Sequence, residues 1–220
     1  MLLNIISEDR IMETWTMFYT TFGSAAVIAA LAMLFFSMEW RHKLHSKNKI
    51  AHRFLIAAVF GVLAIYGSIA AYKSPETGAM CNCRDLAIMY AGLVGGPVGG
   101  IGAAIIGGAF RYFVQGVAMG GNLDVAIPCV IACLTTGIIS SGAHLILKKE
   151  YRYNILVGIM LTAVSSGIHM ALLCAFGFND VAEQIALPMI CADCLGIVFC
   201  LFMYKRCTSK WNTDKKADIE

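Results

Sequence analysis

Charge is scarce in this sequence: Asp, Glu, Lys and Arg make up only 14% of its 220 residues, whereas a soluble domain carries about 25%. The apolar fraction of 59% is too large to be hidden in one water-soluble core. Because no half of the chain is polar, a soluble enzyme domain attached to a membrane anchor is excluded. Proline is also rare, at four residues, which argues against a disordered chain. The sequence therefore predicts a protein that lies almost wholly in a membrane.

Motifs of known catalytic sites are also lacking. The chain contains no nucleophile elbow, no phosphate-binding glycine loop, no HExxH zinc motif and no kinase signature. Its nine cysteines lie mostly in apolar stretches, where cysteine is a small hydrophobic residue, and the nearby histidines are isolated. We therefore expect no enzyme activity, no metal site, no cofactor and no nucleic-acid partner.

Long apolar stretches are what the sequence does have. Five of them reach the length of about 20 residues that a transmembrane helix needs. They cover residues 15–38, 54–72, 125–147, 155–176 and 185–204. A sixth stretch, residues 86–114, differs from these because it contains eight glycines and has Pro97 near its middle. The predicted fold is an all-α polytopic membrane protein with the lipid bilayer as its surroundings.

The basic residues predict the orientation of the chain. Thirteen of the 17 Lys and Arg residues lie in the linker 39–53, the linker 148–154 and the tail 205–220. Since Lys and Arg collect at cytoplasmic ends of helices, we expect these three segments inside. The acidic N-terminus and the acidic turn near Asp180 belong outside. The prediction is one membrane domain, residues 1–204, with its N-terminus outside, followed by a flexible cytoplasmic tail at 205–220.

The same charge pattern restricts the glycine-rich stretch to an even number of crossings. The second span ends outside near Lys73, and the span from residue 125 must also begin outside. We therefore predict five full transmembrane helices plus a re-entrant hairpin with half-helices at 86–94 and 99–114. The hairpin turn would consist of Gly95, Gly96 and Pro97. The alternative is one kinked helix and hence six transmembrane helices, which violates the positive-inside rule once.

Few ionisable residues fall within the apolar stretches, and a charge at membrane depth costs about 2.5–3.5 kcal/mol, so each is a functional candidate. In the hairpin arrangement, Arg84 and Arg111 lie at the two outer ends and converge on one outward-facing cavity. A guanidinium group binds a carboxylate through two parallel hydrogen bonds, so the pair predicts a site for a small anion. Two alternatives remain: Arg84 is an interfacial anchor paired with Asp85, and Arg111 forms a structural bridge to Asp124 or Asp193.

Polar residues in the last two spans form a second group of candidates. Ser166 and His169 are about one helical turn apart and share a face of their helix, and Asp193 lies in the last span. A contact between His169 and Asp193 would form part of a pocket wall or act as a proton-linked switch. The alternative is an interhelical hydrogen bond that only fixes packing.

Three motifs around the glycine-rich stretch carry a resemblance to a known family. They are Asn82-Cys83-Arg84, the glycine-proline run Gly92-Leu93-Val94-Gly95-Gly96-Pro97-Val98-Gly99-Gly100, and Gly108-Ala109-Phe110-Arg111-Tyr112. With them the sequence resembles the LytS-type five-transmembrane receptor domain. That family has an N-x-R motif, a GLxGGPxxG core and a G-x-x-R-[YF] motif, with its two arginines 27 residues apart as they are here. The resemblance extends from about Met12 to Tyr204.

The resemblance implies a sensory input module of bacterial histidine kinases or diguanylate cyclases in the cytoplasmic membrane, some members of which detect small carboxylates such as pyruvate from outside. By motif it implies Asn82, Arg84 and Arg111 as ligand contacts. The further positions carried over to the site are Cys129, Thr135, Ser166, His169 and Asp193. At the last three positions this chain departs from the residues of its relatives, which leaves the identity of the ligand open.

Three functions compete on this basis. The first is a receptor that binds a small extracellular organic anion and passes a conformational change to a cytoplasmic signalling partner or across a homodimer. Only sixteen residues follow Tyr204, so we expect either an excised input domain or a freestanding protein that signals through a partner. The second is a transporter, because the hairpin also resembles the substrate-binding membrane subunits of energy-coupling-factor importers. The third is a structural subunit whose glycines serve only packing.

Overall fold

A computed structural model describes residues 2–38, 44, 47–75, 78 and 80–217, with side chains described from Ile11 to Cys207 within these ranges. The helices are α1 (Leu2–Ser37), α3 (Lys49–Ile69), α4 (Arg84–Ala109), α5 (Leu123–Ile146), α6 (Lys149–Arg152), α7 (Ile155–Ala175) and α8 (Asn179–Ala217). A π-helix, η1 (Phe110–Ala118), continues α4, and the strands β1 (Tyr72–Lys73) and β2 (Met80–Cys81) form an antiparallel pair. Among the described residues six helices are long and apolar enough to cross a membrane, which confirms the all-α membrane fold.

The chain reverses its direction within α4. Gly96 has φ 68° and ψ −155°, a conformation that essentially only glycine adopts. A Cβ atom added at Gly100 would lie 2.8 Å from the Cα atom of Gly92. Residues eight positions apart in a straight helix are about 12 Å apart, so the two halves of α4 lie side by side. Their contact depends on glycines, because a side chain at either position would push the halves apart.

The reversal occurs at Gly96 and Pro97 and is held from outside α4, whereas a re-entrant hairpin in the membrane stays a prediction. Pro97 has no amide hydrogen to donate to the carbonyl oxygen of Leu93, one helical turn earlier. The imidazole Nδ1 of His144 in α5 lies 2.9 Å from this oxygen instead. The other ring nitrogen of His144 lies 3.2 Å from a guanidinium nitrogen of Arg152 in α6. The turn is therefore fixed by contacts with α5 and α6.

The helix α5 lies along both halves of α4. Its contacts with the first half keep a constant spacing of 48 residues, so these two helices run parallel. The contacting pairs are Asp85–Cys133, Gly92–Ser140 and Gly96–His144. The second half runs antiparallel to α5, with Gly100 against Gly137 and Gly108 against Cys133. The helix α3 packs on α4 as well, with Gly61 against Ile106.

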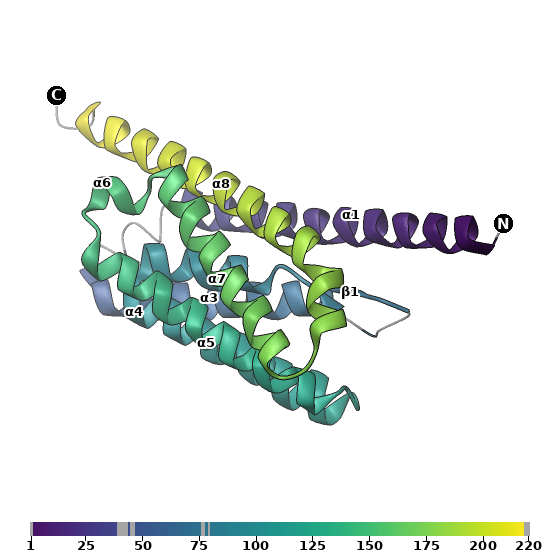
Figure 1. Ribbon diagram of the computed structural model, residues 1–220. Helices are drawn as coiled ribbons and strands as arrows, with labels where there is room; N and C mark the ends of the chain where they lie inside the picture. The colour runs from purple at the N-terminus through teal and green to yellow at the C-terminus, as the bar shows by residue number, and fades with distance from the viewer. Residues whose placement is uncertain (1, 39–43, 45–46, 76–77, 79, 218–220) are drawn as a thin grey trace.

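The helices α1, α7 and α8 form the remaining part of the bundle. Figure 1 shows α1 and α8 running from the side marked N towards the side marked C. Their contacts agree with this parallel arrangement: Glu13 bonds with Gln184, and the ring of Phe36 packs edge-on against that of Tyr204. The helix α7 runs antiparallel to α8, because Gly158 near the start of α7 packs against Leu201 in the second half of α8.

These directions separate basic and acidic segments to opposite ends of the bundle. At the end that we call the basic end, α1 and α5 finish, α3 and α7 begin, and the short α6 lies. The other end we call the hairpin end, after the β1–β2 hairpin that lies there. The first residues of α5 and α8 lie at this end too, among them Asp124 and Asp180. The predicted grouping of the described basic segments is confirmed. Which end faces the cytoplasm stays a prediction.

The last helix extends past the last predicted span. No glycine or proline stands between Cys207 and Ala217 to end α8. The backbone of residues 205–217, for which the sequence predicts a flexible tail, is accordingly helical. The division of the chain into a membrane domain and a tail stays a prediction.

Candidate functional site

The first half of α4 begins inside the protein. Arg84, its first residue, has no exposed surface, and Asp85 is only 3% exposed. A Cβ atom at Gly67 of α3 would lie 3.1 Å from the backbone nitrogen of Arg84, and one at Gly107 would lie 3.5 Å from its Cδ atom. These two glycines leave room for the buried arginine. Arg84 is therefore not an interfacial anchor, although it does pair with Asp85.

Asn82 holds the start of α4 in place. Its side-chain oxygen accepts a hydrogen bond of 3.2 Å from the backbone nitrogen of Arg84, and its amide donates to the carbonyl oxygen of Met80 at 3.3 Å. Asparagine side chains of this kind stabilise turns before helices. In this structure Asn82 positions Arg84, and its role as a ligand contact stays a prediction.

Asp85 joins α4 to α7. One of its carboxylate oxygens lies 3.7 Å from Nε of Arg84, and the other lies 2.7 Å from Nδ1 of His169. The thiol of Cys133 lies 3.8 Å from the first of these oxygens. His169 therefore pairs with Asp85, whereas the sequence suggested Asp193 as its partner. The difference arises because α4 begins deep enough for Asp85 to reach α7.

Asp193 of α8 is the second buried carboxylate. It has no exposed surface, and Ser166 of α7 donates a 3.4 Å hydrogen bond to its Oδ2 atom. Within the described residues, Oδ1 of Asp193 has no hydrogen-bond partner, and neither do Nε2 of His169 or the three guanidinium nitrogens of Arg84. Buried polar groups are nearly always hydrogen-bonded. The buried cluster formed by Arg84, Asp85, Ser166, His169 and Asp193 thus holds unused donors and an unused acceptor.

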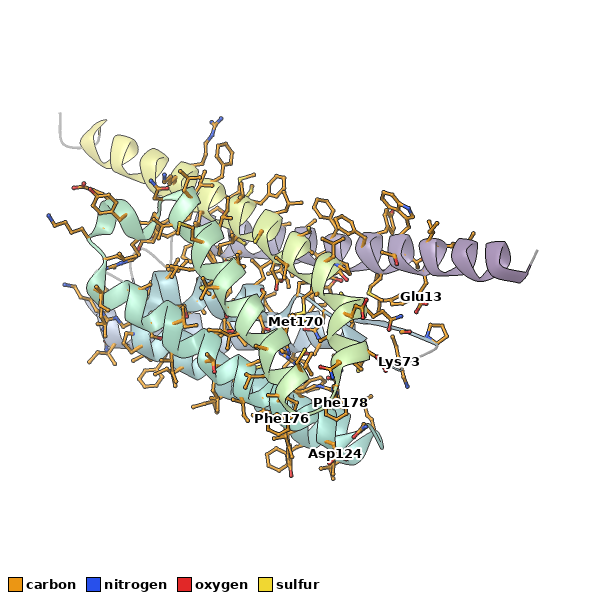
Figure 2. All side chains as sticks on the ribbon, in the orientation of Figure 1. Glu13, Lys73, Asp124, Met170, Phe176 and Phe178 are labelled. Carbon is orange, nitrogen blue, oxygen red and sulfur yellow. The ribbon has the colours of Figure 1, made fainter. Side chains whose placement is uncertain are left out.

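Arg111 lies in η1 beside a cavity of about 360 Å³ at the hairpin end. Lys73 and Val125 line the same cavity, as does Gln115, whose amide is held by a 2.8 Å bond to the carbonyl oxygen of Ser68. Figure 2 shows Lys73 near Glu13 at this end. Arg111 is 5% exposed, and its side chain makes no hydrogen bond or ion pair with any described residue. Its predicted alternative, a bridge to Asp124 or Asp193, is absent from the described part of the chain.

The two arginines approach the same part of α5. Gly107, which contacts the Arg84 side chain, is four positions before Arg111, and such positions lie on one face of a helix. Both guanidinium groups lie within electrostatic range of the thiol of Cys129. Cys129 itself follows Val125 of the cavity by one helical turn. The structure therefore places Cys129 near both Arg84 of the buried cluster and Arg111 of the cavity.

Thr135 does not join this group. Its hydroxyl bonds back to the carbonyl oxygen of Ile131 in the same helix, at 2.8 Å. The next residue, Thr136, is buried and shares a 2.6 Å hydrogen bond with Ser165 of α7. The residue that sequence reasoning undervalued is Asp85, which it considered only as a surface partner of Arg84. A carboxylate directly after a buried arginine, in the first turn of a glycine-rich helix, is the signal that points to it.

A family model described as "5TMR of 5TMR-LYT" matches residues 34–206. Sensor histidine kinase YpdA of Escherichia coli (strain K12) is 30% identical over 197 residues, which are 86% of this chain and 33% of that protein. No solved structure matches this chain.

Two further relatives are sensor proteins named LytS. Sensor protein LytS of Bacillus cereus is 28% identical over 133 residues, or 58% of this chain and 21% of that protein. Sensor histidine kinase/phosphatase LytS of Staphylococcus aureus (strain Mu50) is 32% identical over 131 residues, or 57% of this chain and 21% of that protein. The chain therefore spans a third or less of the relatives' own length.

Proposed function

The chain belongs to the LYT-type five-transmembrane receptor family, and from that membership we propose that it binds a small extracellular organic anion between Arg84 and Arg111. As a sensor domain of the LytS type it is a multi-pass membrane protein. The simplest ligand of the proposed class is a carboxylate such as pyruvate. One observation carries the proposal: Arg111 lines a cavity and Arg84 is buried against Gly107, one helical turn before Arg111, and neither guanidinium group donates a hydrogen bond to a carboxylate among the described residues.

Uncompensated charge is the physical reason for the proposal. A guanidinium group stays ionised inside a protein and is costly to bury unless it is paired and hydrogen-bonded. Among the described residues, Arg84 has one ion pair, the 3.7 Å contact with Asp85, and Arg111 has none. A carboxylate placed between them would accept the short, charge-assisted hydrogen bonds that both groups lack. Lys73, at the mouth of the cavity, would attract such an anion from solution.

The membrane arrangement that we propose is the re-entrant one. Lys73 precedes α4 and Asn122 follows η1, yet both line the same cavity. A segment that begins and ends at one cavity enters and leaves the membrane on the same side. With the basic end in the cytoplasm, the cavity opens outside.

Signal transfer would follow the first half of α4. This half-helix carries Arg84 and Asp85 at one end and the turn held by His144 at the other. A shift caused by ligand binding at Arg84 would therefore change the contact between His144 and Arg152 at the basic end. The partner that receives the signal would be a cytoplasmic signalling protein or a second copy of the chain. Transport is the less favoured function, because the matched relatives are sensor proteins.

Ligand titration tests the receptor function. The full chain in lipid nanodiscs is titrated with pyruvate, and Arg84→Ala and Arg111→Ala are compared with Arg53→Ala, an exposed arginine at the basic end. Loss of one partner of a buried charge contact costs about 2–5 kcal/mol, or about 30-fold or more in Kd. We expect that loss in the two site variants and none in the control. Unchanged affinity in both site variants would disprove the anion site.

Two further measurements separate the proposed function from its competitors. Uptake of labelled acid into proteoliposomes should not exceed passive entry, and accumulation would identify a transporter. Single cysteines at Lys73, Asn122 and Lys149, all exposed positions, test the topology. An impermeant thiol reagent added outside should label the first two, and an inside-facing position 122 would contradict the re-entrant arrangement.

A further inference from the structure

A groove of about 240 Å³ lies between α1 and α8, away from the cavity at Arg111. Six residues of α1, from Phe22 to Met33, and three of α8, from Gly196 to Met203, line it, and all of them are apolar. Both segments lie within helices that are long and apolar enough to cross a membrane. An empty groove would forfeit dispersion contacts, so in the bilayer either hydrocarbon or another helix fills it.

Small residues form the floor of this groove. A Cβ atom added at Gly196 of α8 would lie 3.3 Å from the Cβ atom of Ala25 in α1, so the two helices touch there. Phe22 and Phe199 form the rims and are 36% and 48% exposed. The groove is therefore open towards the hydrocarbon of the bilayer and closed towards the bundle.

The groove occupies one half of the membrane. Phe22 and Met33 are about 16 Å apart along the axis of α1, which is roughly half the thickness of a hydrocarbon core of about 30 Å. The apolar span of α1 runs from Ile11 to Ser37, so the groove extends from near its middle towards the basic end. It thus has the length and the depth of an acyl chain in the leaflet at the basic end.

The width of the groove favours an acyl chain over a helix of a second copy. Spread over about 16 Å, its volume leaves a channel much narrower than a helix, which is about 10 Å across with its side chains. A helix would rest on the rims at Phe22 and Phe199. A hydrocarbon chain is one carbon atom wide and contacts its neighbours at about 3.5–4.0 Å, so it can reach the floor at Gly196.

Basic residues lie where the headgroup of such a lipid would be. The positions of α8 that line the groove, 196, 199 and 203, are three or four residues apart, and Arg206 continues this face beyond Met203. Arg206 and its neighbour Lys205 are exposed, and the guanidinium carbon of Arg206 lies 5.8 Å from the centre of the Phe202 ring. A guanidinium group binds a phosphate through two parallel hydrogen bonds, so the charge at this end of the groove is complementary to a phospholipid headgroup.

We infer that the groove between α1 and α8 holds one acyl chain of an anionic phospholipid in the leaflet at the basic end, with the headgroup phosphate beside Arg206. Because this chain contacts both helices, its binding stabilises their pairing. The inference does not depend on the proposed anion site, whose cavity lies at the hairpin end.

Lipid counting by native mass spectrometry tests this inference. The full chain in detergent is mixed with dioleoyl phosphatidylglycerol, which is anionic, or with dioleoyl phosphatidylcholine, which has the same acyl chains and no net charge. One basic side chain near an anionic lipid changes binding by about fivefold. We therefore expect one phosphatidylglycerol to be retained at least fivefold more tightly than phosphatidylcholine.

A third lipid separates the headgroup from the acyl chain. Dihexanoyl phosphatidylglycerol has the anionic headgroup, but its chains are too short to fill the groove, so we expect it to bind at least fivefold more weakly than the dioleoyl form. Equal retention of the two dioleoyl lipids would overturn the assigned headgroup contact. Equal binding of the short and long forms of phosphatidylglycerol would overturn the assigned groove.

The variant Ala30→Phe fills the groove at an exposed lining position. It should lower the retention of dioleoyl phosphatidylglycerol at least fivefold, whereas Ala171→Phe, the same change at an exposed position of α7, should not. Unchanged retention in Ala30→Phe would overturn the inference. A change from dimer to monomer in this variant, with the lipid still retained, would assign the groove to a second copy and also overturn it.

The variant Arg206→Gln tests the headgroup contact. It should reduce the preference for phosphatidylglycerol over phosphatidylcholine about fivefold. The control Arg53→Gln removes an exposed basic residue of α3 at the same end and should leave the preference unchanged. An unchanged preference in Arg206→Gln would overturn the contact. If a variant does not fold, the three-lipid series on the unaltered chain still decides the inference.

Discussion

The imidazole Nδ1 of His144 lies 2.9 Å from the carbonyl oxygen of Leu93, an oxygen for which Pro97 has no amide hydrogen to offer. Nδ1 must carry the proton to donate this bond, so Nε2 is left as the acceptor for the guanidinium of Arg152 at 3.2 Å. His144 thus connects the turn of α4 with the short helix α6 at the basic end.

Replacement of His144 should weaken this turn. We expect His144→Leu to lower the free energy of unfolding by about 1–3 kcal/mol, since it leaves a buried carbonyl oxygen without a donor. The variant His144→Asn keeps an amide near the Nδ1 position and should recover part of the loss. Denaturant unfolding in detergent measures both. Equal stability of His144→Leu and the unaltered chain would show that water or lipid headgroups satisfy Leu93.

The variant Gly96→Ala should also destabilise this turn, because a side chain at this position strains the backbone. The φ of 68° with ψ of −155° costs a residue with a side chain about 1–3 kcal/mol. A Cβ atom there would also lie 2.9 Å from the His144 ring. We expect a lower melting temperature for Gly96→Ala and no loss for Gly142→Ala, a helical glycine with open space around its Cβ position. Similar melting temperatures for the two variants would argue against a strained turn.

Asp85 competes with the proposed ligand for Arg84. The variant Asp85→Asn should therefore bind the anion more tightly than the unaltered chain. Without ligand it should be less stable, because removal of one partner of a buried ion pair costs about 3–5 kcal/mol. Melting curves with and without ligand measure both effects. A decrease in affinity as large as that of Arg84→Ala would instead make Asp85 part of the binding surface.

The thiol of Cys81 should be unreactive in the folded protein. Its pKa is raised to about 12, mainly by burial and in smaller part by the nearby carboxylate of Asp193, against the effect of a 3.2 Å hydrogen bond from Thr21, which lowers it. The thiolate that reacts with maleimide is therefore nearly absent at pH 8. Mass spectrometry after brief labelling should find exposed Cys174 modified and Cys81 modified only after unfolding. Rapid labelling of both would show that the hairpin end opens readily.

The reversal in α4 could be predicted because its causes are local. Gly96 and Pro97 break a helix wherever they stand together, and the charge pattern required an even number of crossings. The halves are longer than predicted, however, since α4 begins at Arg84 and η1 continues to Ala118. Glycines such as Gly67 make the room that allows α4 to begin at a buried arginine. No local pattern reveals such a contact between separate helices.

The partners within the site could not be predicted for a related reason. Successive residues of a helix point about 100° apart, so a small rotation decides which of two neighbours faces inward. That rotation places Thr136 inside the bundle and leaves Thr135 bonded to its own helix. The orientation of α7 likewise pairs His169 with Asp85 and Ser166 with Asp193 through hydrogen bonds. The sequence predicts which residues gather, and the packing of α7 decides which pairs form.

The helix α8 has a mechanical consequence. It continues as one helix from Asn179 to Ala217, with Pro188 before Asp193, and its last residue lies about 36 Å along the axis from Asp193. Over that length, a small change in the tilt of the helix produces a large displacement of its end. If a ligand group drew Asp193 towards α4 and tilted α8 by about 5°, the far end would move by about 3 Å. Such a tilt would carry a change in the buried cluster to the end of α8, beyond the basic end of the bundle.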